Sequence, residues 1–197
     1  MRAMPWWVAI LSTEREAAEQ YAGLSKEHTF RKLEQQRSRY SEPRRHSNIK
    51  LGRLARDVLA RLFREHGIRC ECDDSPHTEA AKYCIATHRG WLVQTRFIRN
   101  RPTYRNLLDD VPSFERRPHD FYVAMTSRDD LETMEILGYA SREEMMERQP
   151  RDFGQGMRNY YVPLNRCHPL EELITTLLSK PERRGRRFPE LSAGRNA

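Results

Sequence analysis

The chain has 197 residues, which suits one compact domain with extensions. Hydrophobic residues make up 38% and charged residues 32%, and no apolar run approaches the roughly 20 residues of a membrane-spanning helix. The composition therefore argues against a membrane protein and allows a core. The net charge of +7, supplied mainly by arginine, favours a polyanionic partner, most commonly nucleic acid, over a basic protein without such a partner.

The start of the chain and its cysteines indicate a cytoplasmic protein. The apolar part of residues 1–11 is too short for a signal peptide, and no small-residue cleavage site follows it. Four cysteines fit the reduced thiols of a cytosol: Cys70, Cys72, Cys84 and Cys167. A zinc site built from Cys70, Cys72, Cys84 and His88 is an alternative, but its spacing matches no familiar zinc finger, so buried thiols are favoured.

Residues 1–45 are predicted to form an N-terminal helical arm. Residues 5–11 are apolar and suit a strand or an anchor against the domain. The helical composition of residues 14–39 weakens at residues 22–25, which predicts two helices rather than one. Residues 41–48 are polar and contain a proline, so we expect a loop there that marks the boundary of the main domain.

The central stretch, residues 50–97, is predicted to form a helix followed by short strands. Residues 50–67 end in glycine, which terminates helices without strain, and they carry one apolar stripe at helical spacing: Leu51, Leu54, Ala55, Val58 and Leu62. Residues 68–72 alternate as a strand does. Two further strands, over residues 82–88 and 91–98, are separated by a tight Arg-Gly turn, which predicts a hairpin.

The remainder of the chain is predicted to complete a single domain over residues 46–179. Residues 99–117 are basic and contain two prolines, which indicates an exposed excursion. Further elements are strands over 120–126, 131–139 and 160–164, a short helix opened by a capping box at Ser141 and Glu144, and a helix over 169–178. Residues 180–197 contain few apolar side chains and are predicted to form a basic disordered tail.

The order of helix, strand, hairpin and strand, with glycine at Gly52 and alanine at Ala55, resembles the PD-(D/E)XK nuclease superfamily. The closest resemblance is to its Holliday-junction-resolvase and restriction-endonuclease-like members, over about residues 50–178. Residues 121–124 and 138–144 also resemble the downstream strands and helix of that core. The resemblance implies an α/β (α+β) fold, in which a central mixed β-sheet is flanked by helices and preceded by an N-terminal helical extension.

The positions that the resemblance assigns to catalysis are degenerate in this chain. Nucleases of this superfamily hold Mg²⁺ with a glutamate on the helix, an aspartate in the hairpin and an acid-x-lysine on the next strand. Arg56 stands at the helix position and Cys84 at the hairpin position. The strand reads Leu92-x-Gln94 or, with the register shifted by two residues, Gln94-x-Arg96. We therefore expect no catalytic residue, no metal and no cofactor.

Two neighbouring acids leave an active enzyme open as an alternative. Asp73 and Asp74 follow the first strand and could supply a migrated Mg²⁺ site together with Gln94. The competing interpretation is that both aspartates cap a turn, and we favour it.

The resulting hypothesis is a nuclease-fold protein that does not cut but binds nucleic acid, DNA rather than RNA, or scaffolds a nucleic-acid-processing complex. The candidate phosphate contacts are basic side chains around the central stretch, with one tyrosine that could stack on a base: Lys50, Arg53, Arg56, Lys82, Arg89, Arg96, Arg99, Arg101, Arg105 and Tyr104. Six such contacts predict a log–log salt slope of about −5 for duplex. A protein-binding adaptor subunit is a competing hypothesis, and a homodimer is an assembly that the fold would allow.

Overall fold

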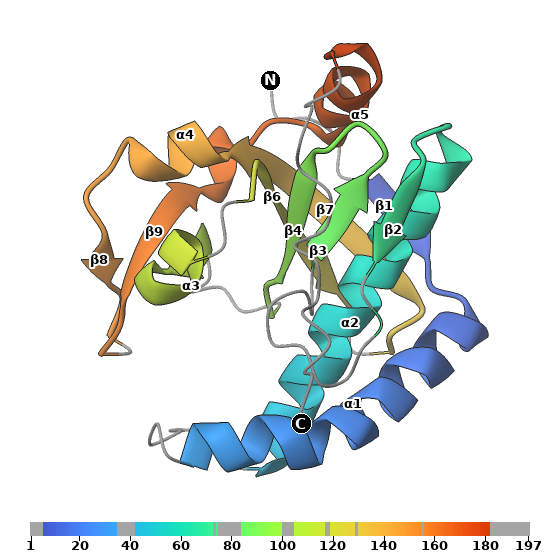
Figure 1. Cartoon of the computed structure of the whole chain (residues 1–197), viewed down its shortest axis with the longest axis vertical. Helices are drawn as coiled ribbons and strands as arrows, with labels where there is room; N and C mark the ends of the chain where they lie inside the picture. Colours follow the sequence, from blue (N-terminus) through green and yellow to red (C-terminus); the bar gives the residue numbers. More distant parts are fainter. Residues whose placement is uncertain are drawn as a thin grey trace, which may run out of the picture.

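The computed structural model describes residues 6–34, 42–72, 74, 84–99, 105–116, 119–128, 130–154 and 156–181. The described strands form a six-stranded sheet and a three-stranded sheet. The six-stranded sheet has, in spatial order, β1 (Trp6–Ala9), β7 (Thr133–Ser141), β6 (Phe121–Ser127), β4 (Leu92–Phe97), β3 (Cys84–Thr87) and β2 (Cys70–Cys72). Figure 1 shows this sheet at the centre of the molecule, with helices on both sides. The fold is therefore mixed α/β, as the sequence predicted.

The large sheet is mixed in strand direction. Strands β2, β3 and β4 form an antiparallel meander, and β6 then pairs in parallel with β4. The predicted hairpin between β3 and β4 is confirmed, and its turn contains Gly90 at φ 79°, a left-handed conformation that glycine adopts at little cost. Strand β7 adds antiparallel to β6, and β1 adds antiparallel to β7 at the edge.

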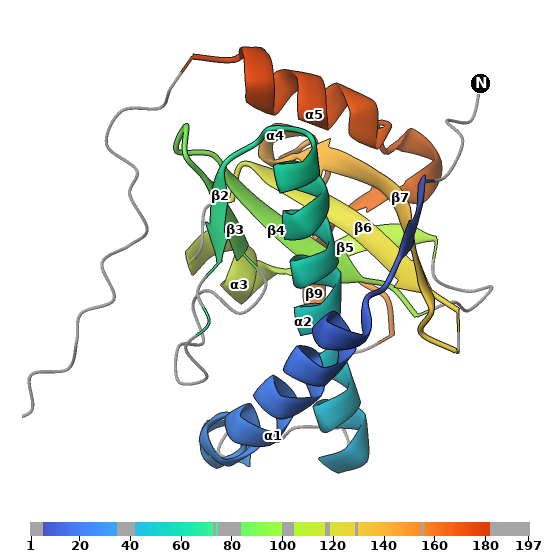
Figure 2. The same cartoon turned by 90° about the vertical axis from the view of Figure 1, so that its right-hand side faces the viewer.

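Two helices, α2 (Glu42–Glu65) and α5 (Leu170–Ser179), cover one face of the large sheet. Figure 2 shows α2 lying across the strands with α5 above them. The predicted apolar stripe of α2 supplies much of the core, because Leu54 and Val58 are fully buried against Val93 and other residues of the sheet. The helix ends before Gly67, which adopts φ 79° and so acts as the predicted terminator.

The three-stranded sheet lies on the other side of the large sheet, with a second core between them. It contains β5 (Asn106–Asp110), β9 (Arg158–Pro163) and β8 (Arg151–Asp152), in that order, and the nearby helices are α3 (Val111–Arg116), α4 (Arg142–Met146) and the 3₁₀ turn η1 (Leu164–Arg166). Phe114 and Met145 anchor α3 and α4 in this core beside Tyr122. The capping box that begins α4 at Ser141 and Glu144 is confirmed.

Helix α1 (Ser12–Glu34) is continuous, so the predicted break at residues 22–25 is wrong. Tyr21 and Ala22 are buried with Ile49 of α2, and this packing outweighs the weak helical propensity of the glycine between Ala22 and Leu24. The predicted loop over residues 41–48 is also wrong, because α2 begins at Glu42 and runs through the expected domain boundary at residues 45 and 46.

Residues 106–116 form β5 and α3 rather than an exposed excursion. The reason is that Leu107 and Phe114 are almost completely buried in the second core. The basic tail falls, from residue 182 on, outside the described residues. Within the part of the chain that the structure describes, no helix combines the length and the apolar character that crossing a membrane requires.

Candidate nucleic-acid interface

Three of the degenerate positions lie together on the large sheet. Cys84 on β3 is directly opposite Gln94 on β4, and both side chains are buried. Gln94 is in register with Tyr122 of β6, whose ring lies in the second core. Because alternate residues of a strand share a face, Leu92 and Gln94 project towards this same side, away from α2. The nuclease-like hairpin positions therefore converge, but they bring together a thiol, a leucine and an amide.

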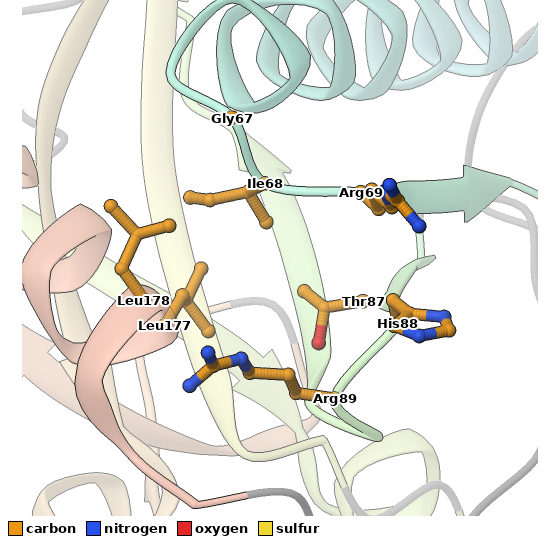
Figure 3. Close-up of a pocket in the computed structure, with 8 residues that line it drawn as sticks. All are labelled: Gly67, Ile68, Arg69, Thr87, His88, Arg89, Leu177 and Leu178. Carbon is orange, nitrogen blue, oxygen red and sulfur yellow. The ribbon is translucent and has the colours of Figure 1, made fainter.

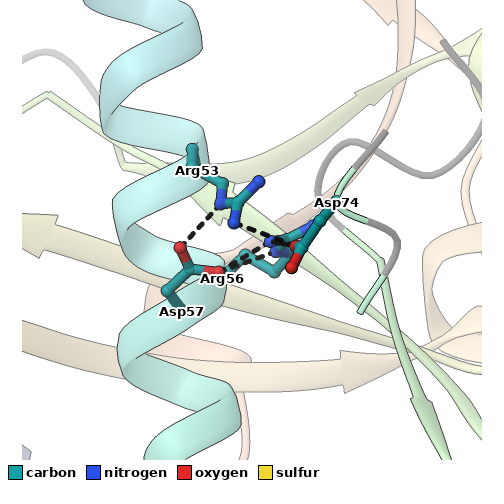
Figure 4. A network of polar contacts seen from close by, with 4 residues as sticks. All are labelled: Arg53, Arg56, Asp57 and Asp74. Carbon is teal, nitrogen blue, oxygen red and sulfur yellow. Dashed lines mark hydrogen bonds and ion pairs between the residues drawn. The ribbon is translucent and has the colours of Figure 1, made fainter. Parts of the chain in front are cut away.

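Arg56 lies on the opposite face of the sheet and does not join them (Figure 4). Its side chain is fully buried, and its guanidinium donates to Asp57 at 2.8 Å and to Asp74 at 2.7 Å. Arg53 donates to the same two carboxylates at 2.6 and 2.9 Å and stacks over the ring of Tyr21. Burial alone would lower the pKa of Arg56, but Asp57, Cys72 and Asp74 raise it above its ordinary value, so this arginine stays charged inside the fold.

The structure places Arg53 and Arg56, both predicted phosphate contacts, in this network. Both guanidiniums are paired with the partly buried carboxylate of Asp57 and the exposed carboxylate of Asp74, and only about 9% of the Arg53 side chain is itself exposed. The same ion pairs disfavour the alternative Mg²⁺ site, because the carboxylate of Asp74 is already paired with two arginines. Asp73 lies outside the described residues.

Arg96 is also engaged inside the protein. Its guanidinium pairs with Asp109 of β5, whose side chain is almost completely buried. Burial lowers the pKa of Arg96, but Asp109 raises it above the ordinary value, so the pair links the two sheets as ions. The structure thus places Arg96, a predicted phosphate contact, in an ion pair between the two sheets. Burial, followed by the charge of Asp109, also raises the pKa of the neighbouring Tyr122 hydroxyl.

The remaining predicted contacts do not form one surface. Lys50 pairs with Glu19 at 2.6 Å, and Arg99 donates to Ser47 and Asn48 near the start of α2. Arg89 precedes β4 whereas Arg99 follows it, so they lie at opposite ends of that strand. Arg105 is exposed at the start of β5. Lys82, Arg101 and Tyr104 lie outside the described residues.

A pocket of about 210 Å³ opens at the β3–β4 turn, between the end of α2 and the end of α5 (Figure 3). Its floor is apolar and its rim is basic, and its lining residues are Gly67, Ile68, Arg69, Thr87, His88, Arg89, Leu177 and Leu178. The rim is held by backbone contacts, because His88 donates its N–H to the carbonyl of Arg69 at 2.8 Å. Arg89 extends to the carbonyl of Lys180 just beyond α5, also at 2.8 Å.

We call the exposed side chains Arg69, His88, Arg89 and Lys180 the basic end. The described residues that line the pocket include no aspartate or glutamate, and nearby Glu65 is paired with Arg61 at 2.9 Å. The sequence predicted only Arg89 of this set as a phosphate contact, and His88 entered only the zinc alternative. The other three precede a strand, occupy the turn or follow a helix, so only the tertiary fold brings them together. The turn His88-Arg89-Gly90 was the one local feature of the sequence that could have indicated the basic end.

The zinc alternative does not match the geometry. All four proposed ligands lie in the described ranges, where no group of three histidine, cysteine or acidic side chains could hold a metal ion. Cys70 faces α2, where its thiol lies 3.5 Å from the carbonyl of Ala60, whereas Cys84 projects to the other face of the sheet. Burial raises the pKa of the Cys72 thiol to about 12, which disfavours the thiolate that zinc requires.

Comparison with known families places residues 26–193 in a family described as "Protein of unknown function (DUF1822)". The chain belongs to this family. No curated protein matches it. No solved structure matches it.

Proposed function

We propose that the chain is a nuclease-fold domain that does not cut and that binds nucleic acid, DNA in particular, through the basic end. The observation that carries the proposal is the order of the core: helix α2, the antiparallel meander β2–β3–β4 and then β6 parallel to β4. This order agrees with the PD-(D/E)XK resemblance, and it places Cys84 opposite Gln94 where that resemblance expects an acid opposite an acid-x-lysine strand.

The side chains at the degenerate positions are poor ligands for Mg²⁺. Mg²⁺ prefers several oxygen ligands, and the buried thiol of Cys84 and the apolar side chain of Leu92 do not supply them. Arg56 adds positive charge on the other side of the sheet, where its two carboxylate partners are already neutralised. A cation at a migrated site on Asp74 would compete with two arginines, because Arg53 and Arg56 both contact its Oδ1.

The proposed binding surface combines positive charge with exposure to solvent. The guanidiniums of Arg69 and Arg89 are exposed, and the described partner of Arg89 is a backbone carbonyl rather than a carboxylate. Within the described part of the chain neither guanidinium forms an ion pair with a carboxylate, so a phosphate would meet cations that keep their charge. Lys180 adds a third full positive charge beside the turn. Three phosphate contacts predict a log–log salt slope of about −3.

The test combines a binding assay with a cleavage assay. A fluorescein-labelled duplex of about 20 base pairs is titrated with protein over a range of salt concentrations, with fluorescence anisotropy as the readout. We expect Arg69→Glu and Arg89→Glu each to weaken binding roughly tenfold and to reduce the salt slope by about one. Arg128→Glu is the matched control, because Arg128 is exposed at the opposite end of the sheet, just after β6.

The cleavage assay uses the same duplex, a branched junction and single strands with Mg²⁺ or Mn²⁺, and we expect no products. Cleavage that Asp74→Asn abolishes would establish the migrated-site nuclease instead. Binding without salt dependence, or equal losses in all three glutamate variants, would remove the basic end as the interface and favour the protein-binding adaptor.

A further inference from the structure

The outer face of the three-stranded sheet carries aromatic rings paired with arginines. Side chains alternate along β9, so Tyr160 and Val162 face the second core, where Tyr160 lies 4.3 Å from Phe114 between ring centroids. Tyr161 projects to the other side, and its neighbour across the strands is Leu108 of β5. Figure 1 shows β9 and β8 at the edge of the molecule.

Tyr161 lies beside a second ring, Phe153, and one arginine lies over each of the two rings. The ring of Phe153 meets that of Tyr161 at 5.1 Å and nearly at right angles. The guanidinium of Arg148 lies over Tyr161 at 5.7 Å, and that of Arg151 lies over Phe153 at 5.8 Å. We call Tyr161, Phe153, Arg148 and Arg151 the aromatic face. Helices α3 and α4 place Phe114 and Met145 in the core on the opposite side of the sheet.

We infer that the aromatic face is a stacking platform for single-stranded nucleic acid, an inference that rests on the proposed function but uses a different surface. Aromatic rings bind bases of any sequence through their flat faces, and arginines beside them hold the phosphates and stack on the bases. In a duplex the bases already stack on one another, so only an unpaired strand can offer its bases to Tyr161 and Phe153.

The combination of positive charges and rings on this face favours nucleic acid over an acidic peptide. An acidic peptide would neutralise Arg148 and Arg151 but would leave both ring faces without a flat partner. The nearby carboxylate of Asp152 accepts the N–H of Gly156 at 3.1 Å within its own turn. The aromatic face is separate from the basic end, whose pocket is lined by aliphatic, basic and His88 side chains and by no tyrosine or phenylalanine among the described lining residues.

The test is an anisotropy titration of fluorescein-labelled dT20 and of the duplex with wild-type protein, Tyr161→Leu and Phe153→Leu. We expect each substitution to weaken dT20 binding on the order of tenfold and to leave duplex binding within twofold. Trp7→Leu is a matched control, because Trp7 is a 47% exposed ring with Arg128 stacked 5.0 Å over it on the opposite edge of the large sheet. The same titration with Arg151→Ala adds a variant that leaves the rings in place, and thermal melting verifies that each protein is folded.

Selective loss of dT20 binding in the aromatic-face variants supports the inference. If the wild-type protein binds the duplex but not dT20, or if Tyr161→Leu and Trp7→Leu bind dT20 equally well, this inference is overturned while the proposed function stands. If the wild-type protein binds neither, both are overturned.

Discussion

Two groups of arginines occupy the same central segment of the sequence but have opposite environments. Arg53 and Arg56 are buried against the sheet and share the carboxylates of Asp57 and Asp74, whereas Arg69 and Arg89 are exposed beside the pocket. Their residue type is identical, so burial and the acids within reach decide what each group does. The two buried arginines are balanced by the carboxylates of Asp57 and Asp74, whereas the exposed arginines leave positive charge on the surface at the basic end.

The most sensitive test of the difference between buried and exposed arginines is to replace a buried arginine and measure stability. Arg56→Leu leaves Asp57 with one fewer cationic partner inside the fold, so we expect the free energy of unfolding to fall by about 3 kcal/mol. Urea unfolding followed by circular dichroism measures it. The control is Arg64→Leu on the exposed side of the same helix, for which a change within about 0.5 kcal/mol is expected. Equal costs for the two variants would contradict the distinction.

The ion pair between Arg96 and Asp109, on the other face of the sheet, should also stabilise the fold, but by a smaller amount. Asp109→Asn removes the charge that balances Arg96, and we expect a loss of about 2 kcal/mol because Arg96 is only partly buried. Asp110→Asn is the matched control, since asparagine can still accept the N–H of Ser113 as Asp110 does at 2.9 Å. The same unfolding experiment would refute the prediction if both variants lost equal stability.

Much of the fold was predictable because its signals are local. The apolar stripe of α2 has helical spacing, Gly67 ends the helix, and the capping box at Ser141 lies within four residues. The continuity of α1 was not predictable from composition, because it depends on the packing of Tyr21 and Ala22 against Ile49, which is far along the chain.

The candidate site was predictable only in part, because partners distant in sequence decide it. Arg56 lies off the apolar stripe and has the sequence context of a surface residue, but Asp74, eighteen residues on, folds back to pair with it. Arg96 likewise depends on Asp109, thirteen residues on. Conversely, Arg69 and Lys180 joined Arg89 only when α2, the hairpin and α5 came together.

Glu144 and His168 form a partly exposed pair, intermediate between the buried arginine pairs and the exposed arginines. Glu144 is partly buried, which raises its pKa, but the N–H of Ser141 and the ring of His168 at 2.5 Å outweigh burial and hold the pKa below its ordinary value. Because the folded-state pKa is lowered, the pair stabilises the fold above the unfolded pKa of about 4.5, and this stability is lost as pH falls through the folded value.

Glu144→Gln keeps the capping box and removes the charge, so we expect it to cost about 0.5 kcal/mol at pH 7 and less at pH 3. Unfolding curves in urea at both pH values measure the difference. Glu143→Gln, an exposed neighbour, serves as the control. An equal gap at pH 3 would show that packing rather than charge is responsible.

The smallest expected effect concerns the stability of the basic end itself. Arg69→Ala and Arg89→Ala remove exposed charges, and the hydrogen bond from Arg89 to the carbonyl of Lys180 lies in solvent, so we expect changes within about 0.5 kcal/mol in urea unfolding. A loss comparable to that of Arg56→Leu would mean that these arginines serve the fold as Arg56 does. A near-zero loss combined with weaker duplex binding means instead that the basic end is free to bind because the fold does not depend on it.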